Sequence, residues 1–408
     1  MEWLRVPFIL GMFLVSCLSD DIGGFDLEGI AQDFLDLPEE KAAGVLSKFN
    51  KNEGKVSLAT LRYVLVVTRH GSRSPTYTYP TDPYPFTDLK FWPNGPGQLT
   101  RLGKQQLFRT GLILRHRYNG FLNANYYSND TEVRSNPYDR DYMSAACLLA
   151  ALYPPVGFQV WNKKIAWQPI PIWEDRYDIA EIASKEALCP KFYELQTKNL
   201  DRLNQESSKY TNLFKYLSKN TKDKINTISR IPLIWDTLQA QQENGYKLPE
   251  WTKKVFPDRM RGLEGVAFQA YVYGPDPEQI KLVVGPLLEM ILDQLNTKAS
   301  GKMQPDRKLY INAAHDITLR ALLDGMGLHR TFPIDTSAFM VYELHENSAG
   351  HIVRTLYYSN SSTHQPQILN LPLCHNPCSL KTFTSVLQKN VPRNWREECQ
   401  NTTSDESR

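Results

Sequence analysis

Apolar and polar positions along the chain predict strands and helices in alternation. The run from Tyr63 to Val67 is continuously apolar and rich in β-branched residues, a pattern typical of a strand buried on both faces. The same pattern returns from Lys308 to Ala314. The predicted strands are residues 63–67, a strand ending at 132–135, 308–314, and a hairpin made of 339–345 and 352–358.

Predicted helices fill the intervals between these strands. Thr100 suits the N-cap of a helix that runs to about Tyr118, because its hydroxyl can accept a hydrogen bond from a free backbone N–H. An alanine-rich helix is expected over 141–153, where Pro154 and Pro155 stop it. Two more helices are expected over 277–297 and 317–326.

This order of elements predicts an α/β fold in which a mixed central sheet is flanked by helices. Residues 175–260 differ from the rest, since they are rich in Lys, Gln and Asn and carry few strand signals. We expect them to form a smaller, mostly helical subdomain. The predicted division is an α/β domain of residues 59–174 and 261–399, the inserted helical subdomain at 175–260, and a polar tail at 400–408.

The N-terminal part of the chain consists of two segments of different character. An apolar run at 6–18 follows Arg5 and precedes small and acidic residues, which is the order of a secretory signal peptide. We therefore expect a signal peptide at 1–19. The alternatives are an apolar helix packed into a core and a bacterial lipid-attachment box ending at Cys17. Residues 20–58 are expected to be an acidic extension.

Composition and charge narrow the classes of function. The 408-residue chain has 47 Lys and Arg against 44 Asp and Glu, a net charge of +3. A surplus this small gives no reason to expect nucleic acid as a partner, because such proteins carry dense basic stripes. The apolar run at 6–18 is shorter than the roughly 20 residues that cross a bilayer, so we expect no transmembrane anchor. Three Asn-x-Ser/Thr acceptors for glycosylation, at Asn129, Asn360 and Asn401, agree with export.

The cysteines also agree with export. Cys374 and Cys378 are close enough in sequence to close a small disulfide loop. Their spacing could also be half of a zinc site, but no second Cys/His pair with ligand spacing accompanies them. Cys147 lies in an apolar helical stretch and is expected to be a buried free thiol.

The motif Arg69-His70-Gly71-Ser72-Arg73 directly follows the first predicted strand. Two guanidinium groups around an imidazole behind a buried strand need an anion, because unpaired buried cations are costly. The planar fork of arginine matches phosphate oxygens, which makes phosphate the natural ligand. The alternative is a surface turn whose arginines pair with nearby carboxylates.

A second polar cluster follows the strand at 308–314. His315 supplies another imidazole and Asp316 a carboxyl group, with a predicted helix N-terminus that favours bound anions. Arg134 lies at the end of the strand predicted at 132–135, and α/β sheets bind ligands at the carboxyl ends of their strands. Phosphoryl transfer from an ester needs a nucleophile, cations around the phosphate and an acid for the leaving group, and this set with His70 can supply all three. Taken alone, Asp316 could equally be a helix cap.

The two clusters resemble the two signatures of the histidine acid phosphatase family. The likeness extends from about Tyr63 to Cys399 and includes the segments 97–100, 139–145 and 167–171. It implies a fold of the phosphoglycerate mutase kind. Ser72 departs from the family pattern, since close relatives often carry an acidic residue there, and Trp235 is expected to border the pocket.

The resemblance also implies roles for individual residues. His70 is the expected nucleophile, which becomes phosphohistidine, and Asp316 is the expected proton donor to the leaving oxygen. No metal and no cofactor are implied. The implied phosphate ligands are Arg69, Arg73, Arg134 and His315, and the implied disulfides are Cys189–Cys399 and Cys374–Cys378.

Small phosphate monoesters are the expected substrates, in an extracellular or lysosomal setting, and a homodimer is compatible with the sequence. Three alternatives stay open. One is a relative with narrowed specificity, for lysophosphatidate, nucleotides or inositol phosphates. Another is a phosphate-binding relative without catalysis. The third is a phosphomutase, which must keep its phosphoryl group from water.

Overall fold

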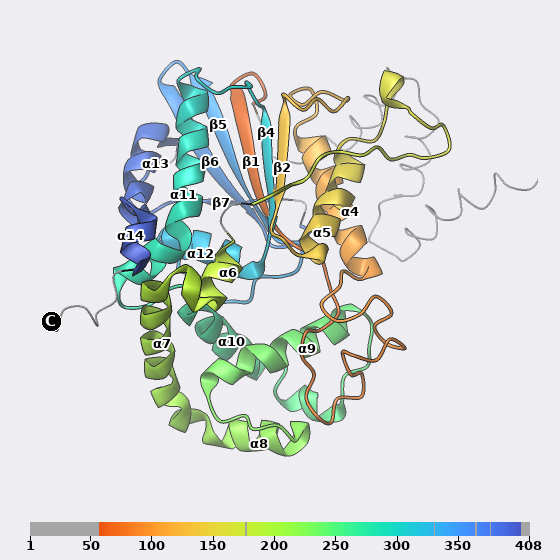
Figure 1. Ribbon diagram of the computed structural model, residues 1–408, viewed down its shortest axis with the longest axis vertical. Helices are drawn as coiled ribbons and strands as arrows, with labels where there is room; N and C mark the ends of the chain where they lie inside the picture. The colour runs from red at the N-terminus through yellow and green to blue at the C-terminus, as the bar shows by residue number, and fades with distance from the viewer. Residues whose placement is uncertain (1–56, 176–177, 330, 364, 376, 401–408) are drawn as a thin grey trace, which may run out of the picture.

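The computed structural model describes residues 57–175, 178–329, 331–363, 365–375 and 377–400. Figure 1 shows a central sheet with helices on both faces and a further group of helices beneath one end of the sheet. The predicted signal peptide, residues 20–56 of the predicted extension, and residues 401–408 with the acceptor Asn401 lie outside the described residues.

The sheet is mixed, as predicted. Its strands run in the order β3-β2-β4-β1-β5-β6-β7, with β8 paired to β6. The pairs β3–β2, β2–β4 and β4–β1 are parallel. The pairs β1–β5, β5–β6, β6–β7 and β6–β8 are antiparallel. The strands are β1 (Leu61–Arg69), β2 (Thr131–Ser135), β3 (Trp173–Glu174), β4 (Leu309–Ala314), β5 (Phe339–Asn347), β6 (Gly350–Tyr358), β7 (Gln367–Leu369) and β8 (Cys378–Ser379).

The long predicted helices are also present. Thr100 is the N-cap of α4, and its hydroxyl accepts a hydrogen bond from the backbone N–H of Gly103. The α-helices are α4 (Arg101–Arg117), α5 (Asp139–Leu152), α6 (Ile179–Ser184), α7 (Pro190–Gln205), α8 (Thr211–Thr221), α9 (Ile231–Glu243), α10 (Asp258–Ala270), α11 (Pro277–Ala299), α12 (Asp316–Gly325), α13 (Leu380–Leu387) and α14 (Trp395–Gln400). Short 3-10 helices are η1 (Gly157–Gln159), η2 (Glu186–Leu188), η3 (Glu206–Tyr210), η4 (Ile228–Arg230), η5 (Glu250–Lys254) and η6 (Gln388–Asn390). None of the described helices is long and apolar enough to cross a membrane.

Alternate side chains of β1 enter two hydrophobic cores, one on each face of the sheet. Val64 and Val66 pack in the core that α4 and α5 cover. Leu65 and Val67 pack in the opposite core, which contains the apolar face of α11. Since a fully buried Val or Leu contributes about 1.5–3 kcal/mol, the two cores hold β1 firmly in place. The end of β1 is therefore a rigid base for the residues that follow it.

A third hydrophobic core belongs to the helices beneath the sheet. It joins α8, α9 and α10, with partly buried Leu203 at the end of α7. Residues of α6 and the first part of α7 pack instead in the main core. Trp235, which the sequence suggested as a border of the pocket, packs in the helical core against Phe256, with ring centroids 4.8 Å apart.

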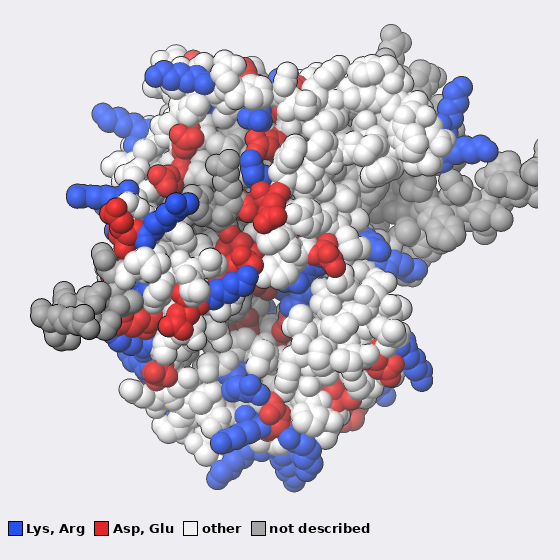
Figure 2. Space-filling view, viewed as in Figure 1, with Lys and Arg blue, Asp and Glu red and all other residues white. Residues whose placement is uncertain are grey.

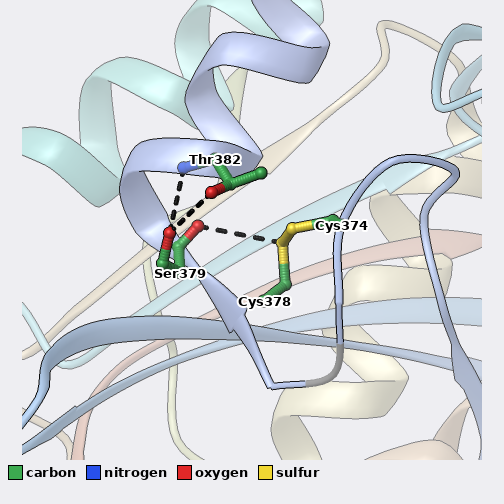
Figure 3. Close-up of a disulfide and its surroundings, with 4 residues drawn as sticks. All are labelled: Cys374, Cys378, Ser379 and Thr382. Atoms are coloured by element: carbon green, nitrogen blue, oxygen red, sulfur yellow. Dashed lines mark hydrogen bonds between the residues drawn. A yellow bond between two sulfur atoms is a disulfide. The ribbon is translucent and has the colours of Figure 1, made fainter.

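Both predicted disulfides are confirmed. The bond between Cys189 and Cys399 joins the start of α7 to α14. The bond between Cys374 and Cys378 closes a short loop beside the start of α13 (Figure 3), which excludes the zinc alternative for this pair. Cys147 is a free thiol, as expected, but it is only partly buried.

Candidate active site

The two polar clusters of the sequence meet at the carboxyl end of the sheet. Parallel pairing sets Arg69 opposite Ala314, and the backbone N–H of His70 continues the ladder to the Ala314 carbonyl at 2.9 Å. The next residue on each strand is therefore a histidine. The rings of His70 and His315 lie edge to face, with centroids 5.6 Å apart. Figure 2 shows the molecular surface hollowed between the sheet and the helices beneath it, with acidic and basic side chains around the hollow.

A close backbone approach fixes the turn that carries His70. A Cβ atom on Gly71 would lie 2.3 Å from the carbonyl oxygen of Gly103, and one on Gly103 would lie 2.1 Å from that of Ser72. No side chain fits at either position without moving the backbone. The turn after β1 thus sits directly on the first turn of α4, where glycine is required at both contacts.

One nitrogen of the His70 ring is hydrogen-bonded, and the other has no hydrogen-bond partner among the residues that the structure describes. Its Nδ1 lies 2.8 Å from the Gly71 carbonyl oxygen. A carbonyl only accepts, so Nδ1 carries the proton and Nε2 keeps its lone pair. Burial lowers the pKa of His70 well below its usual range, and the charges of Arg69, Arg140 and Arg73 lower it further. The ring is consequently a neutral base even in acid.

Arg69 and Asp316 form a close ion pair. A guanidinium nitrogen of Arg69 lies 2.6 Å from an oxygen of Asp316, and Arg69 also donates to the carbonyl of Ile334. Burial opposes ionisation of Asp316, but Arg69 and the other nearby cations outweigh it, so the pKa of this carboxyl lies below its usual range. Asp316 is the first residue of α12 and accepts from the Ile317 N–H at 2.8 Å, so the predicted cap contact accompanies its place in the cluster.

Arg73 is held from the helical side of the hollow. It donates two hydrogen bonds to Asp236 of α9, at 2.9 and 3.2 Å, and its Nε has no hydrogen-bond partner among the described residues. The positive charge of Arg73 lowers the pKa values of both His70 and Asp316. An arginine that is oriented by a carboxylate and still has an unpaired N–H is well prepared to bind an anion.

Arg134 does not join this cluster, in contrast to the expectation from its place at a strand end. Its Nε donates to Glu132 at 2.7 Å and its Nη1 to the carbonyl of Glu174 at 2.9 Å. The side chain alternation of β2 explains the difference. Arg134 falls on the partly exposed face of the strand, whereas Val133 and Ser135 are buried.

Arg140 takes the position expected for Arg134. Its guanidinium carbon lies 4.6 Å from the ring centroid of Tyr138, and that ring contacts the ring of His315, with centroids 5.0 Å apart. Its charge lowers the pKa values of both His70 and His315. Arg140 lies in the first turn of α5, one turn beyond the strand end that the sequence singled out.

A partly buried carboxyl group lies beside Ser72, where the sequence departs from the family pattern. Glu243, at the end of α9, accepts hydrogen bonds from Ser72 and from the hydroxyl of Thr336, at 3.2 Å. Burial raises the pKa of Glu243, while the nearby Arg69 opposes that rise. A carboxyl group from a residue distant in sequence thus lies beside the position where relatives often carry an acidic one.

The sequence matches a known family over most of this architecture. Residues 60–358 match the sequence model of the histidine phosphatase superfamily (branch 2). The chain belongs to this family. Lysosomal acid phosphatase from Homo sapiens is 34% identical over 350 residues, which cover 84% of this chain and 80% of the relative. Prostatic acid phosphatase from Rattus norvegicus is 32% identical over 357 residues, which cover 84% and 90%.

Solved structures confirm the fold of this histidine phosphatase. A phytase from Citrobacter braakii superposes with a TM-score of 0.63 at 18% identity, over 84% of this chain and all of the phytase chain. A Hafnia alvei phytase in complex with myo-inositol hexakis sulphate gives a TM-score of 0.63 at 17% identity. At this identity the likeness concerns the fold, which is the mixed α/β architecture expected from the sequence.

The family resemblance contained the signal for Arg140. Residues 139–145 match the family in sequence, whereas Arg134 stands at the predicted strand end and so was the more obvious candidate. The same segment contains Asp141, a buried carboxyl group 3.4 Å from His315 Nε2. His70, Asp141 and His315 offer atoms within 4.8 Å of one another, a spacing that a metal ion could span. Arg69, Arg73 and Arg140 surround them, however, so the charge of this histidine phosphatase site favours an anion.

Proposed function

We propose that the protein hydrolyses phosphate monoesters, with His70 as the nucleophile. The single observation that carries this proposal is the state of the His70 ring, whose Nδ1–H is bound to the Gly71 carbonyl and whose Nε2 keeps a free lone pair among arginines. Those guanidinium groups match the charge and geometry of a phosphate dianion. The nucleophile and its electrostatic support are thus assembled before the substrate arrives.

The reaction proceeds in two displacements. Nε2 of His70 attacks phosphorus, so that a P–N bond forms while the P–O bond to the alcohol breaks and Asp316 gives its proton to the leaving oxygen. Water then attacks phosphorus, the P–N bond breaks, and Asp316 takes up a proton from the water. Inorganic phosphate leaves and the neutral His70 is restored.

Asp316 must gain a proton before it can act as the acid. In the unliganded pocket Arg69 holds it as a carboxylate, 2.6 Å away. A bound phosphate dianion draws Arg69 to itself and places negative charge beside the carboxylate, and both effects raise the pKa of Asp316. We therefore expect activity to be greatest in acid, where this proton is available and His70 is still neutral.

Loss of the nucleophile tests this function. His70→Ala should abolish release of phosphate from p-nitrophenyl phosphate at pH 5, because it removes the ring nitrogen that attacks phosphorus. His375→Ala is a suitable control, since His375 is exposed and remote in sequence from the cluster. Two results would contradict the covalent mechanism. One is full turnover in the His70 variant, and the other is failure to trap an acid-labile phosphoryl group on His70 in the native protein.

We also propose passage through the secretory pathway to the lysosome or the cell exterior. The basic and apolar leader at 1–19 and the two disulfides support it, because structural disulfides persist in oxidising compartments. Asn129 is exposed and Asn360 partly exposed, so both are accessible glycosylation candidates alongside Asn401. Expression in cultured cells should give a product shortened at its N-terminus whose mass falls on treatment with peptide N-glycosidase.

A homodimer is a further part of this proposal. Large apolar side chains are exposed along the segment between α5 and β3, and β3 is an edge strand of the sheet. In Figure 2 the surface at upper right, where Figure 1 shows this segment, is largely uncharged apart from basic side chains at its outer edge. Apolar patches of this kind mark association sites. The side chains concerned are Phe158, Trp161, Trp167 and Trp173, and replacing Trp167 and Trp173 with Glu should convert a dimer to a monomer in sedimentation velocity.

A further inference from the structure

Asp141 is a buried carboxyl group that the reaction described above does not use. Its side chain is fully buried, and neither of its oxygens has a hydrogen-bond partner among the described residues. One of them lies 3.4 Å from Nε2 of His315, a buried nitrogen that also lacks a hydrogen-bond partner there. A buried carboxylate with no hydrogen bonds is costly to maintain. Asp141 therefore needs either a proton or a charged partner.

We propose that Asp141 and His315 share one proton, and that this proton enables the pocket to bind the dianionic phosphate group of the substrate. The inference rests on the phosphatase function proposed above and deepens it. With the proton, the pair carries no net charge, whether the proton resides on the carboxyl or on the imidazole. Without it, the pair brings a negative charge to within 4.8 Å of a nitrogen of His70.

The groups that face Asp141 come from four elements and explain where the proton resides. Burial raises the pKa of Asp141 well above its usual range, and the charges of Asp178 and Asp316 add to burial, although Arg140 and Arg73 oppose it. Burial and Arg140 lower the pKa of His315 to about 3. Both shifts favour Asp141 as the holder in the unliganded pocket. The facing groups are Arg140 on α5, His70 and Arg73 after β1, His315 and Asp316 at the start of α12, and Asp178 at the N-cap of α6.

The proton matters because the phosphate binds on the same side of the cluster. A phosphoryl group that reacts with Nε2 of His70 has its oxygens near His315, since the two rings are in edge-to-face contact. A carboxylate at Asp141 would repel that dianion in a site with little water to screen it. A carboxylic acid leaves the attraction of the arginines unopposed. Asp141 thus does not take part in the chemical step. It assists phosphate binding through the proton that it shares with His315.

Sulfate binding at a series of pH values tests the proposal. Sulfate stays a dianion throughout the range from pH 4 to pH 9, unlike phosphate, so any change in its affinity reports on the protein. In the native protein the dissociation constant should rise with pH by up to about tenfold for each pH unit above the pKa of the pair. Asp141→Asn has no proton to lose at this position, so its dissociation constant should depend on pH less steeply than that of the native protein. The remaining slope comes from Asp316, whose pKa a bound dianion raises. Titration calorimetry measures both.

A matched control comes from the same helix. Asp139 is exposed at the first residue of α5, where its carboxylate accepts from Gln98 at 3.1 Å. Asp139→Asn should show the pH dependence of the native protein. Glu264, another buried carboxyl near the site, has its pKa raised by burial to about 8 and is the strongest rival for the same effect. Glu264→Gln should leave the pH dependence of the sulfate dissociation constant unchanged.

Three outcomes overturn the proposal. They are a native protein whose sulfate affinity does not change with pH, an Asp141→Asn variant with the native slope, and a Glu264→Gln variant in which the slope disappears. Tight sulfate binding by Asp141→Asn at pH 4 shows that its pocket is intact, and Asp141→Ser replaces it if the Asn variant does not fold. Sulfate binding needs no turnover. A protein with the expected slopes that hydrolyses no ester would therefore contradict the proposed function and leave the shared proton standing.

Discussion

Arg73 and Asp236 form a bidentate ion pair across the hollow between the sheet and the helices beneath it. The guanidinium nitrogens of Arg73 lie 2.9 and 3.2 Å from the two carboxylate oxygens of Asp236. Arg73 follows β1, whereas Asp236 lies on α9, so the pair joins the two parts of the molecule. The helical part thus has a direct role at the site, because it orients one of the cations around His70.

Asp236→Ala should weaken substrate binding more than it slows the chemical step. Without the carboxylate, Arg73 loses a fixed orientation but keeps its charge. We expect KM for p-nitrophenyl phosphate to rise about tenfold, the effect of one charge-assisted hydrogen bond of about 1.5 kcal/mol, with a smaller change in kcat. Glu250→Gln provides the control, since the ion pair of Glu250 with Lys253 is exposed to solvent. A fall in kcat alone, with KM unchanged, would show that Asp236 does not position Arg73 for binding.

Arg140 and Arg134 should differ sharply when each is replaced. Arg140 lies against the ring pair of Tyr138 and His315, whereas the guanidinium of Arg134 is bound to Glu132 and Glu174. Arg140→Ala should lower kcat/KM by about tenfold to a hundredfold or more, because a charged hydrogen bond to phosphate is worth about 1.5–3 kcal/mol. Arg134→Ala should change kcat/KM less than threefold. The reverse order of effects would restore the assignment suggested by the sequence.

Asp316→Asn should distinguish substrates by their leaving groups. An aryl phosphate such as p-nitrophenyl phosphate releases an oxygen that needs little protonation, whereas an alkyl phosphate such as glycerol 2-phosphate releases a basic one. The variant should therefore lose at least tenfold more activity on the alkyl ester than on the aryl ester. Equal losses on both would mean that Asp316 acts through its ion pair with Arg69 and not as the acid.

Much of the fold could be predicted because its signals are local. The apolar run at 63–67 and the cap at Thr100 each dictate an element by themselves, and β1 and α4 begin or end within a few residues of the prediction. The short strands β3, β7 and β8 were not predicted. They have two or three residues each and depend on pairing with distant strands, which no local pattern encodes.

The sequence could predict those site residues that directly follow a predicted strand. His70 and His315 follow adjacent parallel strands, so the sequence could bring them together. Asp236, Glu243 and Arg140 were missed for a different reason. Each projects from a helix, and whether a helical side chain reaches the site depends on how that helix packs, which is a tertiary property.

The two disulfides should contribute unequally to stability. Cys189 and Cys399 are 210 residues apart, whereas Cys374 and Cys378 are four apart. Closing a longer loop removes more entropy from the unfolded chain, about 5 kcal/mol for the first and about 2 kcal/mol for the second. Replacing the first pair with serine should therefore lower the midpoint of guanidinium unfolding more than replacing the second. The opposite order would show that native packing around each bond, and not loop length, determines its contribution.

The shared proton of Asp141 should also be visible in stability, without any ligand. Because burial raises the pKa of Asp141 in the folded protein, the folded state holds a proton that the unfolded chain releases above its ordinary pKa of about 3.9. The free energy of unfolding therefore falls as pH rises from about 4 towards the raised pKa, by about 1.4 kcal/mol for each full pH unit in that window. Asn does not titrate, so the Tm of Asp141→Asn relative to the native protein should increase with pH over the same window. A difference in Tm that stays constant with pH would mean that Asp141 ionises normally in the fold, and the arginines around His70 would then have to neutralise it as a carboxylate.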